Sequence, residues 1–216
     1  HTVTAMLYCG LPGRHFWLSA FFVPRFLACS FAVRPALILI SCAVMKKFAN
    51  FDAGEEAIKK MTTIIMYAVI INTFFFLLEF FVGYYSEVPG HMHSLEYLFF
   101  GLEHHGEVYN NLVPFMWTAT LFNFAGLGIL GYMKIAKIFD FRLVTVASIL
   151  IFLALWTDKG LGFVFAGFVP NPLEEVTEYY PTLNEIGITI GVWATGFLLL
   201  TLLYKIALGV EEEVEH

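Results

Sequence analysis

The chain has 216 residues, of which 59% are hydrophobic and only 14% are charged, and its formal net charge is −6. Soluble domains carry about 25% charged residues, so this composition excludes an ordinary water-soluble domain and predicts a protein embedded in the lipid bilayer. The sequence has no cluster of Lys and Arg of the kind that binds nucleic acid, and we expect no nucleic-acid partner.

Five apolar stretches are long enough for helices that cross a bilayer, which need about 20 residues. We expect Pro24 and Pro35 to kink the first of them. An extra apolar segment, 160–169, is too short and too rich in glycine to span, and we interpret it as a re-entrant or interfacial piece. The expected spans are residues 16–45, 61–85, 108–133, 141–157 and 186–205. The predicted fold class is an all-α integral membrane protein, a bundle of about five transmembrane helices within residues 16–209.

The two ends of the chain lie outside this bundle. The first residue is His1 rather than Met, and we expect residues 1–15 to be the remnant of a longer N-terminal region. Residues 210–216 are predicted to form an acidic tail.

Lys and Arg in short connecting loops indicate the orientation, because such loops stay on the cytoplasmic side. Basic residues lie in the connection between the first and second spans, in the connection between the third and fourth spans, and at the end of the fifth span. These three places fall on one side of the predicted membrane, and their residues are Lys46, Lys47, Lys59, Lys60, Lys134, Lys137, Arg142 and Lys205. We therefore expect a multi-pass protein of the cell membrane with a cytoplasmic C-terminus. Loops 86–111 and 158–185 would be extracytoplasmic, and together they would form an acidic cap.

Loop 86–111 contains a second helical pattern. Ser94 is a candidate helix cap, and four apolar residues that follow it share one helical face: Leu95, Leu98, Phe99 and Leu102. The pattern predicts a short amphipathic helix at the extracytoplasmic membrane surface.

Ionisable and polar residues inside the predicted spans are the first candidates for chemistry, because burying them in lipid is costly. Glu79, in the second span, is either a proton-relay carboxylate whose pKa is raised by burial or the partner of Arg25 in an interhelical salt bridge. Asn72 and Asn123 are expected to hydrogen-bond between helices, with the lining of a polar path as the alternative. Glu79, Asn72 and Asn123 are therefore the candidates for a proton path.

The predicted amphipathic helix carries His93, Glu96 and Tyr97 on its other faces. These side chains could bind a quinone oxygen and exchange its proton, since quinone chemistry needs a hydrogen-bond donor and a nearby titratable group. Arg25 is the fourth candidate for quinone binding. The alternative is a helix whose polar face is simply solvated.

The sequence predicts that the chain has no redox centre of its own. No histidine pair lies within the predicted spans to ligate haem, and the three cysteines, Cys9, Cys29 and Cys42, are scattered. We expect no metal site, no haem and no iron–sulfur centre, and we expect the cysteines to pack as small apolar residues.

Four segments carry a resemblance to a known family. LPGRHFWLSAFFVPRFLACSFAVRPALILI resembles the opening of the second half of the NrfD/polysulfide-reductase membrane subunits, and TEYYPTLNEIGITIGVWATGFLLLTLLYKI resembles their last span. The segments HSLEYLFFG and NNLVPFMWTAT are similar to the membrane subunit of Dsr complexes (DsrP) in sulfate- and sulfur-metabolising prokaryotes. The resemblance places the chain in the C-terminal half of such a subunit.

The resemblance implies a function and a set of partners. Such subunits bind menaquinone near the extracytoplasmic face, contain no haem, and dock a periplasmic ferredoxin-like iron–sulfur subunit. In Dsr complexes, cytochrome c, cytochrome b and a cytoplasmic iron–sulfur subunit complete the electron path between the quinone pool and sulfite reduction.

The leading hypothesis is therefore a quinone-interacting subunit of a respiratory electron-transfer complex of sulfur or sulfite metabolism, with proton conduction as an additional role. Two alternatives stay open. One is a secondary transporter or ion-conducting subunit, indicated by the ionisable residues within the spans and by the broken segment 160–169. The other is a structural membrane anchor for redox partners.

Overall fold

The structure is a computed structural model of the chain, and it describes residues 2–11, 13–49, 53–86, 88–104, 107–169, 176 and 181–214. The chain divides into two compact units, His1–Thr177 and Glu178–His216.

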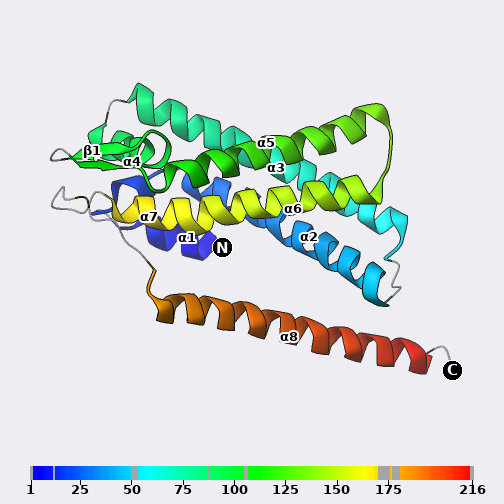
Figure 1. Cartoon of the computed structure of the whole chain (residues 1–216). Helices are drawn as coiled ribbons and strands as arrows, with labels where there is room; N and C mark the ends of the chain where they lie inside the picture. The colour runs from blue at the N-terminus through cyan, green and yellow to red at the C-terminus, as the bar shows by residue number, and fades with distance from the viewer. Residues whose placement is uncertain are drawn as a thin grey trace. The chain divides into compact units, whose positions relative to one another are not determined.

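Four long antiparallel helices form the first unit (Figure 1). Their bounds are α2 Phe22–Ala49, α3 Glu55–Tyr85, α5 Val113–Ala136 and α6 Phe141–Thr157. The connections from α2 to α3 and from α5 to α6 lie at one end of the unit, which we call the lysine end, and the long connection from α3 to α5 lies at the other. The predicted all-α membrane fold is confirmed.

Short elements cover the end of the unit at which α2 begins and α3 ends. They are two short helical segments before α2, a helix after α3, and an antiparallel strand pair in which Glu103 faces Val108. Their bounds are α1 Thr2–Cys9, η1 His15–Trp17, α4 Pro89–Phe99, β1 Leu102–His104 and β2 Glu107–Tyr109.

The second unit consists of one helix, α8, Leu183–Val214. The Glu185 carboxylate accepts hydrogen bonds from the backbone N–H and the hydroxyl of Thr182, at 2.7 and 2.9 Å, as a capping residue does. The side chains of its apolar stretch are exposed within this unit. An exposed apolar surface of this kind is typical of a helix that faces lipid or a partner protein.

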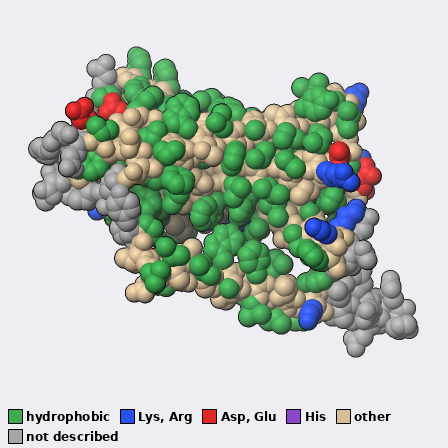
Figure 2. Space-filling model, in the orientation of Figure 1, with side chains coloured by type: hydrophobic (Ala, Val, Ile, Leu, Met, Phe, Trp, Pro, Cys, Tyr) green, Lys and Arg blue, Asp and Glu red, His purple; other side chains and the backbone are tan. Residues whose placement is uncertain are grey.

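Five helical segments of the described chain are long and apolar enough to cross a membrane. They are Phe22–Phe48, Glu55–Tyr85, Val113–Ala136, Phe141–Phe168 and Leu183–Ile206. Hydrophobic side chains also cover the flank of the first unit (Figure 2). The chain is therefore a multi-pass membrane protein.

The fourth spanning segment differs from the expectation. The helix α6 does not end at Thr157 but runs through a π-helical turn, η2 Asp158–Gly162, into α7 Phe163–Phe168. The segment 160–169 is thus mostly the last part of a continuous helix rather than a separate re-entrant piece. The charged pair Asp158–Lys159, which suggested a loop, lies within the helical unit because both side chains have partners there.

Helix ends also differ from the sequence-based bounds. Helix α3 begins six residues early because two i,i+4 ion pairs, Glu55–Lys59 and Glu56–Lys60, extend it beyond the apolar run. Helix α5 begins five residues late because Glu107–Tyr109 forms β2. Helix α2 begins at Phe22, so Pro24 lies in its first turn, where a missing N–H costs no helical hydrogen bond.

The helix predicted to start at Ser94 begins earlier as well. Pro89 occupies its first turn, and Ser94 lies in its middle, where its hydroxyl is 3.2 Å from the carbonyl oxygens of both Gly90 and Val169. Three of the four residues predicted to share an apolar face, Leu95, Leu98 and Phe99, are buried on α4. The fourth, Leu102, is buried too, but it lies on β1 because the helix ends at Phe99.

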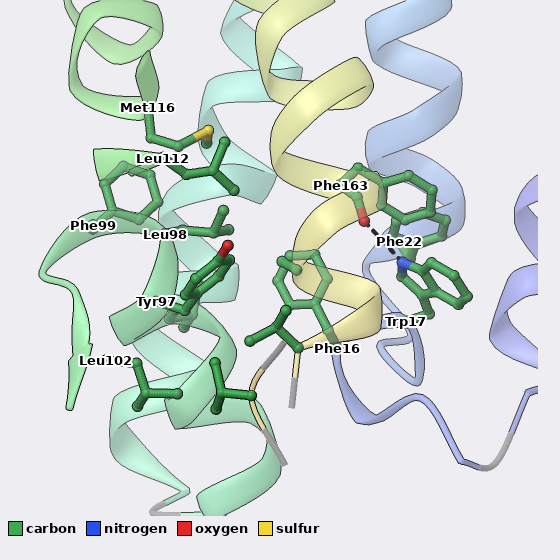
Figure 3. Close-up of a cluster of buried hydrophobic side chains, with 14 of the residues drawn as sticks. Phe16, Trp17, Phe22, Tyr97, Leu98, Phe99, Leu102, Leu112, Met116 and Phe163 are labelled. Atoms are coloured by element: carbon green, nitrogen blue, oxygen red, sulfur yellow. Dashed lines mark hydrogen bonds between the residues drawn. The ribbon is translucent and has the colours of Figure 1, made fainter. Parts of the chain in front are cut away.

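Two hydrophobic clusters fill the first unit. The first, which we call the aromatic half, lies around η1, α4 and α7 (Figure 3). There the Trp17 indole N–H donates a hydrogen bond of 3.0 Å to the Phe163 carbonyl, and Phe22 stacks on the Phe163 ring with centroids 4.5 Å apart. The second, the aliphatic half, lies between α2, α3, α5 and α6, and its fully buried members include Ala32, Ala36, Ile65, Val69, Val144, Ala147 and Ile151.

Candidate functional site

Four charged side chains meet inside the aromatic half, and we call them the ionic cluster. Arg25 stands in the first turn of α2, Glu79 stands near the end of α3, and Asp158 and Lys159 stand on η2. One Arg25 nitrogen donates to the Glu79 carboxylate, and the other lies 2.9 Å from both carboxylate oxygens of Asp158. The Lys159 ammonium is 3.3 Å from Asp158 Oδ2. The cluster therefore holds two positive and two negative groups and is neutral as a whole.

The ionic cluster is shielded from solvent. The Arg25, Glu79, Lys159 and Asp158 side chains are only 5%, 10%, 12% and 15% exposed. Glu79 lies six residues before the end of α3, which is about 9 Å along a helix axis. Charges at such a depth are stable only when they are paired and hydrogen-bonded, and removing one of them leaves another uncompensated.

The π-helical turn brings the cluster together. An extra residue in a helical turn rotates the side chains that follow it, and such turns are frequent at functional sites. Gly162, which ends the turn, also lets the chain approach α5 closely: a Cβ at this position would lie 2.7 Å from Met116 Sδ. The turn therefore carries Asp158 and Lys159 into the space between α2, α3 and α5.

A small cavity of about 20 Å³ borders the ionic cluster, and its lining includes the polar side chains of Arg25, Asp158, Asn72 and Asn123. The Asn123 amide donates a hydrogen bond of 2.9 Å to the Thr73 hydroxyl. The side-chain oxygens of Asn72 and Asn123 are buried and have no hydrogen-bond partner among the described residues. The cavity has the volume that one water molecule requires, and a water there would bring a hydrogen-bond donor beside these two side chains.

A larger cavity of about 220 Å³ lies on the other side of Glu79, and we call it the His91 cavity. Its two titratable side chains are Glu79 on α3 and His91 on α4. Leu18 and Val82, at its rim, are 39% and 38% exposed. The other lining residues are Phe16, Ser19, Ala20, Phe21, Gly83 and Leu95.

His91 has an environment that favours its neutral form. Partial burial lowers its pKa below the ordinary value, the charge of the neighbouring His15 lowers the pKa further, and Glu79 opposes this with a smaller effect. His15 is held against α4 at Gly90, where a Cβ would lie 2.7 Å from the imidazole Cγ. His91 is therefore a neutral imidazole near pH 7, able to donate a hydrogen bond from one nitrogen and accept one at the other.

The structure brings some of the predicted site residues together. Arg25 contacts Glu79, which is the salt-bridge alternative, and Arg25, Asn72 and Asn123 line one cavity. Tyr97 is 3% exposed and belongs to the aromatic half rather than to a polar face of α4 (Figure 3).

His93 and Glu96, the other two predicted quinone ligands, are half-buried on α4. Neither lines the small cavity beside Arg25 or the His91 cavity. Neither of these two cavities therefore joins the four predicted quinone-binding residues.

Three residues of the site escaped the sequence analysis: Asp158, Lys159 and His91. Asp158 and Lys159 interrupt an otherwise apolar stretch that continues from 143 to 169, and this was a readable signal for a buried pair. His91 stands four residues before Leu95 and seven before Leu98, on the same helical face.

None of these groups forms a metal site. Within the described ranges, no three His, Cys, Asp or Glu side chains are grouped so that they could hold a metal ion. The arrangement offers instead hydrogen bonding and proton exchange at a partly buried cavity in a membrane protein.

Comparison with known families assigns this membrane protein to a class. The family model described as "Polysulphide reductase, NrfD" matches residues 1–158. The chain belongs to the NrfD family, whose members are quinone-interacting membrane subunits of polysulphide-reductase-like complexes and associate with iron–sulfur and cytochrome subunits. The matched range includes Arg25, Glu79, His91 and Asp158. No curated protein matches the chain.

Proposed function

We propose that the chain is the quinone-interacting subunit of a respiratory complex of sulfur or sulfite metabolism, and that it binds the head group of menaquinone in the His91 cavity. The observation that supports this most is the position of Glu79, which borders the His91 cavity and also pairs with Arg25 of the ionic cluster. A quinone in the cavity would thus lie beside His91 and Glu79, two side chains that can exchange protons with it.

The cavity has the chemistry that a quinone head group requires. Its walls are mostly apolar, and its volume of about 220 Å³ lies just below the roughly 300–1,000 Å³ of pockets that enclose drug-sized ligands. It therefore suits a ring system without a prenyl tail. The exposed rim residues Leu18 and Val82 would let the tail leave toward the lipid. His91 would bind one quinone oxygen, as a donor to a carbonyl or an acceptor from a hydroxyl.

The ionic cluster gives the proton of a bound quinol an acceptor, the Glu79 carboxylate. Arg25 stays protonated and holds Glu79 and Asp158 in place, so the proton would move onward along water rather than through the guanidinium. Arg25 and Asp158 both border the small cavity of Asn72 and Asn123. A water in that cavity would extend the chain of hydrogen bonds toward the middle of the membrane. Glu79, Asn72 and Asn123 are the residues of this proposed proton path.

The quinone site predicted from the sequence is the alternative to binding in the His91 cavity. In it the head group lies against His93, Glu96 and Tyr97 on α4, with Arg25 as a further ligand. Because His91 and His93 are two residues apart on one helix, they project about 200° apart around its axis and serve different sites. Substitution of each histidine separates the two arrangements.

Electron transfer requires redox partners. We propose that these are a periplasmic ferredoxin-like iron–sulfur subunit, cytochrome c and cytochrome b subunits, and a cytoplasmic iron–sulfur subunit. In this assembly the lysine end faces the cytoplasm, and the end that carries α4 faces outward. Of the acidic cap expected to dock the partner, Glu174, Glu175 and Glu178 lie outside the described residues.

Menaquinol oxidation by the purified intact complex tests the proposal. We expect His91→Gln to lower kcat/KM by about 100-fold, the effect of removing a positioned acid–base group. Glu79→Gln should lower it as well, and Glu56→Gln, an exposed carboxylate at the start of α3 and outside the acidic cap, should leave it unchanged.

Three outcomes decide between the arrangements. Loss of activity in His91→Gln with full activity in His93→Gln supports the His91 cavity. The reverse result would establish the rival site on α4. Full quinol turnover in both variants and in Glu79→Gln would refute a quinone role for this chain and favour a structural anchor.

A further inference from the structure

A third cavity lies at the lysine end of the first unit, and we call it the lysine pocket. Its volume is about 410 Å³, and it lies between the first half of α3 and the last turns of α5. Three basic side chains line it: Lys59, Lys134 and Lys137. Its apolar walls are Met66, Leu130, Met133, Ile138 and Phe139, and Thr62 and Thr63 complete it.

The lysine pocket combines a basic mouth with an apolar floor. Met66, Leu130 and Met133 are 8%, 3% and 5% exposed and belong to the aliphatic half. Lys134 and Lys137 are exposed at the end of α5, where Lys137 adopts the left-handed conformation with φ 53° that ends the helix. The pocket therefore presents positive charge next to the bilayer flank of the protein.

The charges of two lysines in the pocket are not neutralised within the first unit. Lys59 pairs with Glu55 and lies 4.9 Å from the Phe139 ring centroid. Lys134 and Lys137, in contrast, have no carboxylate within salt-bridge distance in the described part of the chain. Their six N–H donors are available to an anion.

The surrounding end of the unit is also basic. Lys and Arg side chains gather there (Figure 2). The described basic residues are Lys46, Lys47, Lys59, Lys60, Lys134, Lys137 and Arg142, and the described acidic ones are Glu55, Glu56 and Asp140. A surface of this kind at the end of membrane-spanning helices attracts anionic lipids.

The two threonines of the pocket do not compete with the lysines as donors. The Thr62 hydroxyl donates to the Ile58 carbonyl at 2.7 Å, and the Thr63 hydroxyl donates to the Lys59 carbonyl at 2.9 Å. Since both hydroxyl protons are already used, only the ammonium groups are left to bind an anion.

We propose that the lysine pocket binds an anionic phospholipid, with its phosphate between Lys59, Lys134 and Lys137 and one acyl chain against Met66, Leu130 and Met133. The basic mouth selects a negative head group, and the apolar floor selects an acyl chain, which a soluble anion lacks. Helices α3 and α5 contact each other less extensively than α2 and α3 do. A lipid bound in the pocket would fill the space between α3 and α5. This inference does not depend on the proposed quinone function, because the residues that line the pocket lie at the start of α3 and the end of α5, at the opposite end of the unit from α4.

Native mass spectrometry of the intact complex, titrated with phosphatidylglycerol or phosphatidylcholine, tests the inference. We expect a retained phosphatidylglycerol adduct and a weaker phosphatidylcholine adduct. The double variant Lys134→Gln/Lys137→Gln should bind phosphatidylglycerol about 30-fold more weakly, the effect of two basic residues near an anionic surface. The matched control is Lys46→Gln/Lys47→Gln, which removes the same charge at the same end but from side chains that do not line the pocket.

A second variant tests the apolar floor. Thr63→Trp would fill the pocket without changing its charge, and it should also lose the adduct. Far-ultraviolet circular dichroism and the midpoint of thermal unfolding establish that each variant is folded.

Several results would overturn the inference. They are equal binding of the two lipids, equal loss in the Lys46/Lys47 control, or retention of the adduct in Thr63→Trp. Displacement of the lipid by millimolar inorganic phosphate would show that the pocket is a site for a free anion instead.

Discussion

The aromatic and the aliphatic halves of the first unit use the same four helices for different purposes. The aliphatic half is built from small and branched side chains, and Ala32, Ala36 and Ala147 are fully buried where α2 meets α6. The aromatic half contains the ionic cluster and the His91 cavity. Small residues let membrane helices pack closely, whereas large rings leave gaps that polar groups and ligands can occupy. The comparison teaches that buried ionic groups are concentrated in the aromatic half, whereas the aliphatic half is closely packed where α2 meets α6 and opens at the lysine pocket.

The strongest test of this division removes a charge from the ionic cluster. Arg25→Met leaves the Glu79 and Asp158 carboxylates without their arginine in a nearly dry site, and we expect the free energy of unfolding to fall by about 3 kcal/mol. Unfolding of the purified protein in mixed detergent micelles measures it. The double variant Arg25→Met/Glu79→Gln restores neutrality and keeps the Lys159–Asp158 pair, so it should recover more than half of the loss. A double variant less stable than Arg25→Met would contradict a role for charge balance.

The cluster also shows what the sequence could predict. The apolar runs predict the helices, because a bilayer requires about 20 consecutive apolar residues and the sequence contains them. Pairing of Glu79 with Arg25 was one of two alternatives. Asp158 was missed because a charged pair followed by glycine is typical of a loop, although its place inside a long apolar stretch was a signal against one. Its partner Arg25 on α2 is 133 positions away in the chain, and a pairing over that distance leaves no pattern that identifies the partner.

His93, rather than His91, was selected from the sequence as a site residue, and this choice has a local cause. The positions of Leu95, Leu98 and Phe99 on the apolar face of α4 were predicted correctly, but the helix was expected to start at Ser94, which left His91 outside it. Pro89 in the first turn is itself a helix-start signal, and it extends the apolar face back to His91. The end of a helix can thus decide which titratable side chain reaches a cavity.

The second prediction tests the packing of the aliphatic half. A Cβ at Gly126 would lie 2.6 Å from Ile151 Cγ1 and 3.3 Å from the Ala147 carbonyl oxygen. Because the backbone of α6 cannot move aside, we expect Gly126→Ala to lower the free energy of unfolding by about 2 kcal/mol. Gly128→Ala is the matched control on the same helix, since nothing lies within 4 Å of its Cβ. It should leave stability unchanged or raise it slightly. Equal effects of the two substitutions would show that α5 and α6 are not closely packed.

The third prediction concerns a single hydrogen bond in the aromatic half. Trp17→Phe removes the indole N–H that bonds to the Phe163 carbonyl, and we expect a loss of about 1 kcal/mol. Trp156→Phe, on a side chain that is 41% exposed, should have no effect in the same unfolding measurement. A loss in Trp156→Phe as large as that in Trp17→Phe would assign the effect to ring size rather than to the hydrogen bond.

The smallest effect is expected from the titration of His91. Its pKa is lowered in the folded protein by burial and by His15 on η1, against the opposing charge of Glu79 on α3. The unfolded chain therefore binds more protons than the folded chain just below the ordinary histidine pKa of about 6.5. Stability should fall as the pH falls from 7 through this range, and His91→Gln should flatten the dependence. The measurement is the detergent unfolding midpoint between pH 7.5 and 5.5.

The same titration should affect quinone binding, and this links the small stability effect to the proposed function. Protonation of His91 removes its acceptor nitrogen, so a quinol hydroxyl in the His91 cavity would lose its partner over the same pH range. We expect the KM for menaquinol to rise on acidification in the wild type and to lose this dependence in His91→Gln. If His91→Gln flattens the stability profile but leaves the pH dependence of KM intact, the histidine titrates in the folded protein but does not contact the quinol. In that case the quinone site would have to be sought on the other face of α4, at His93 and Glu96.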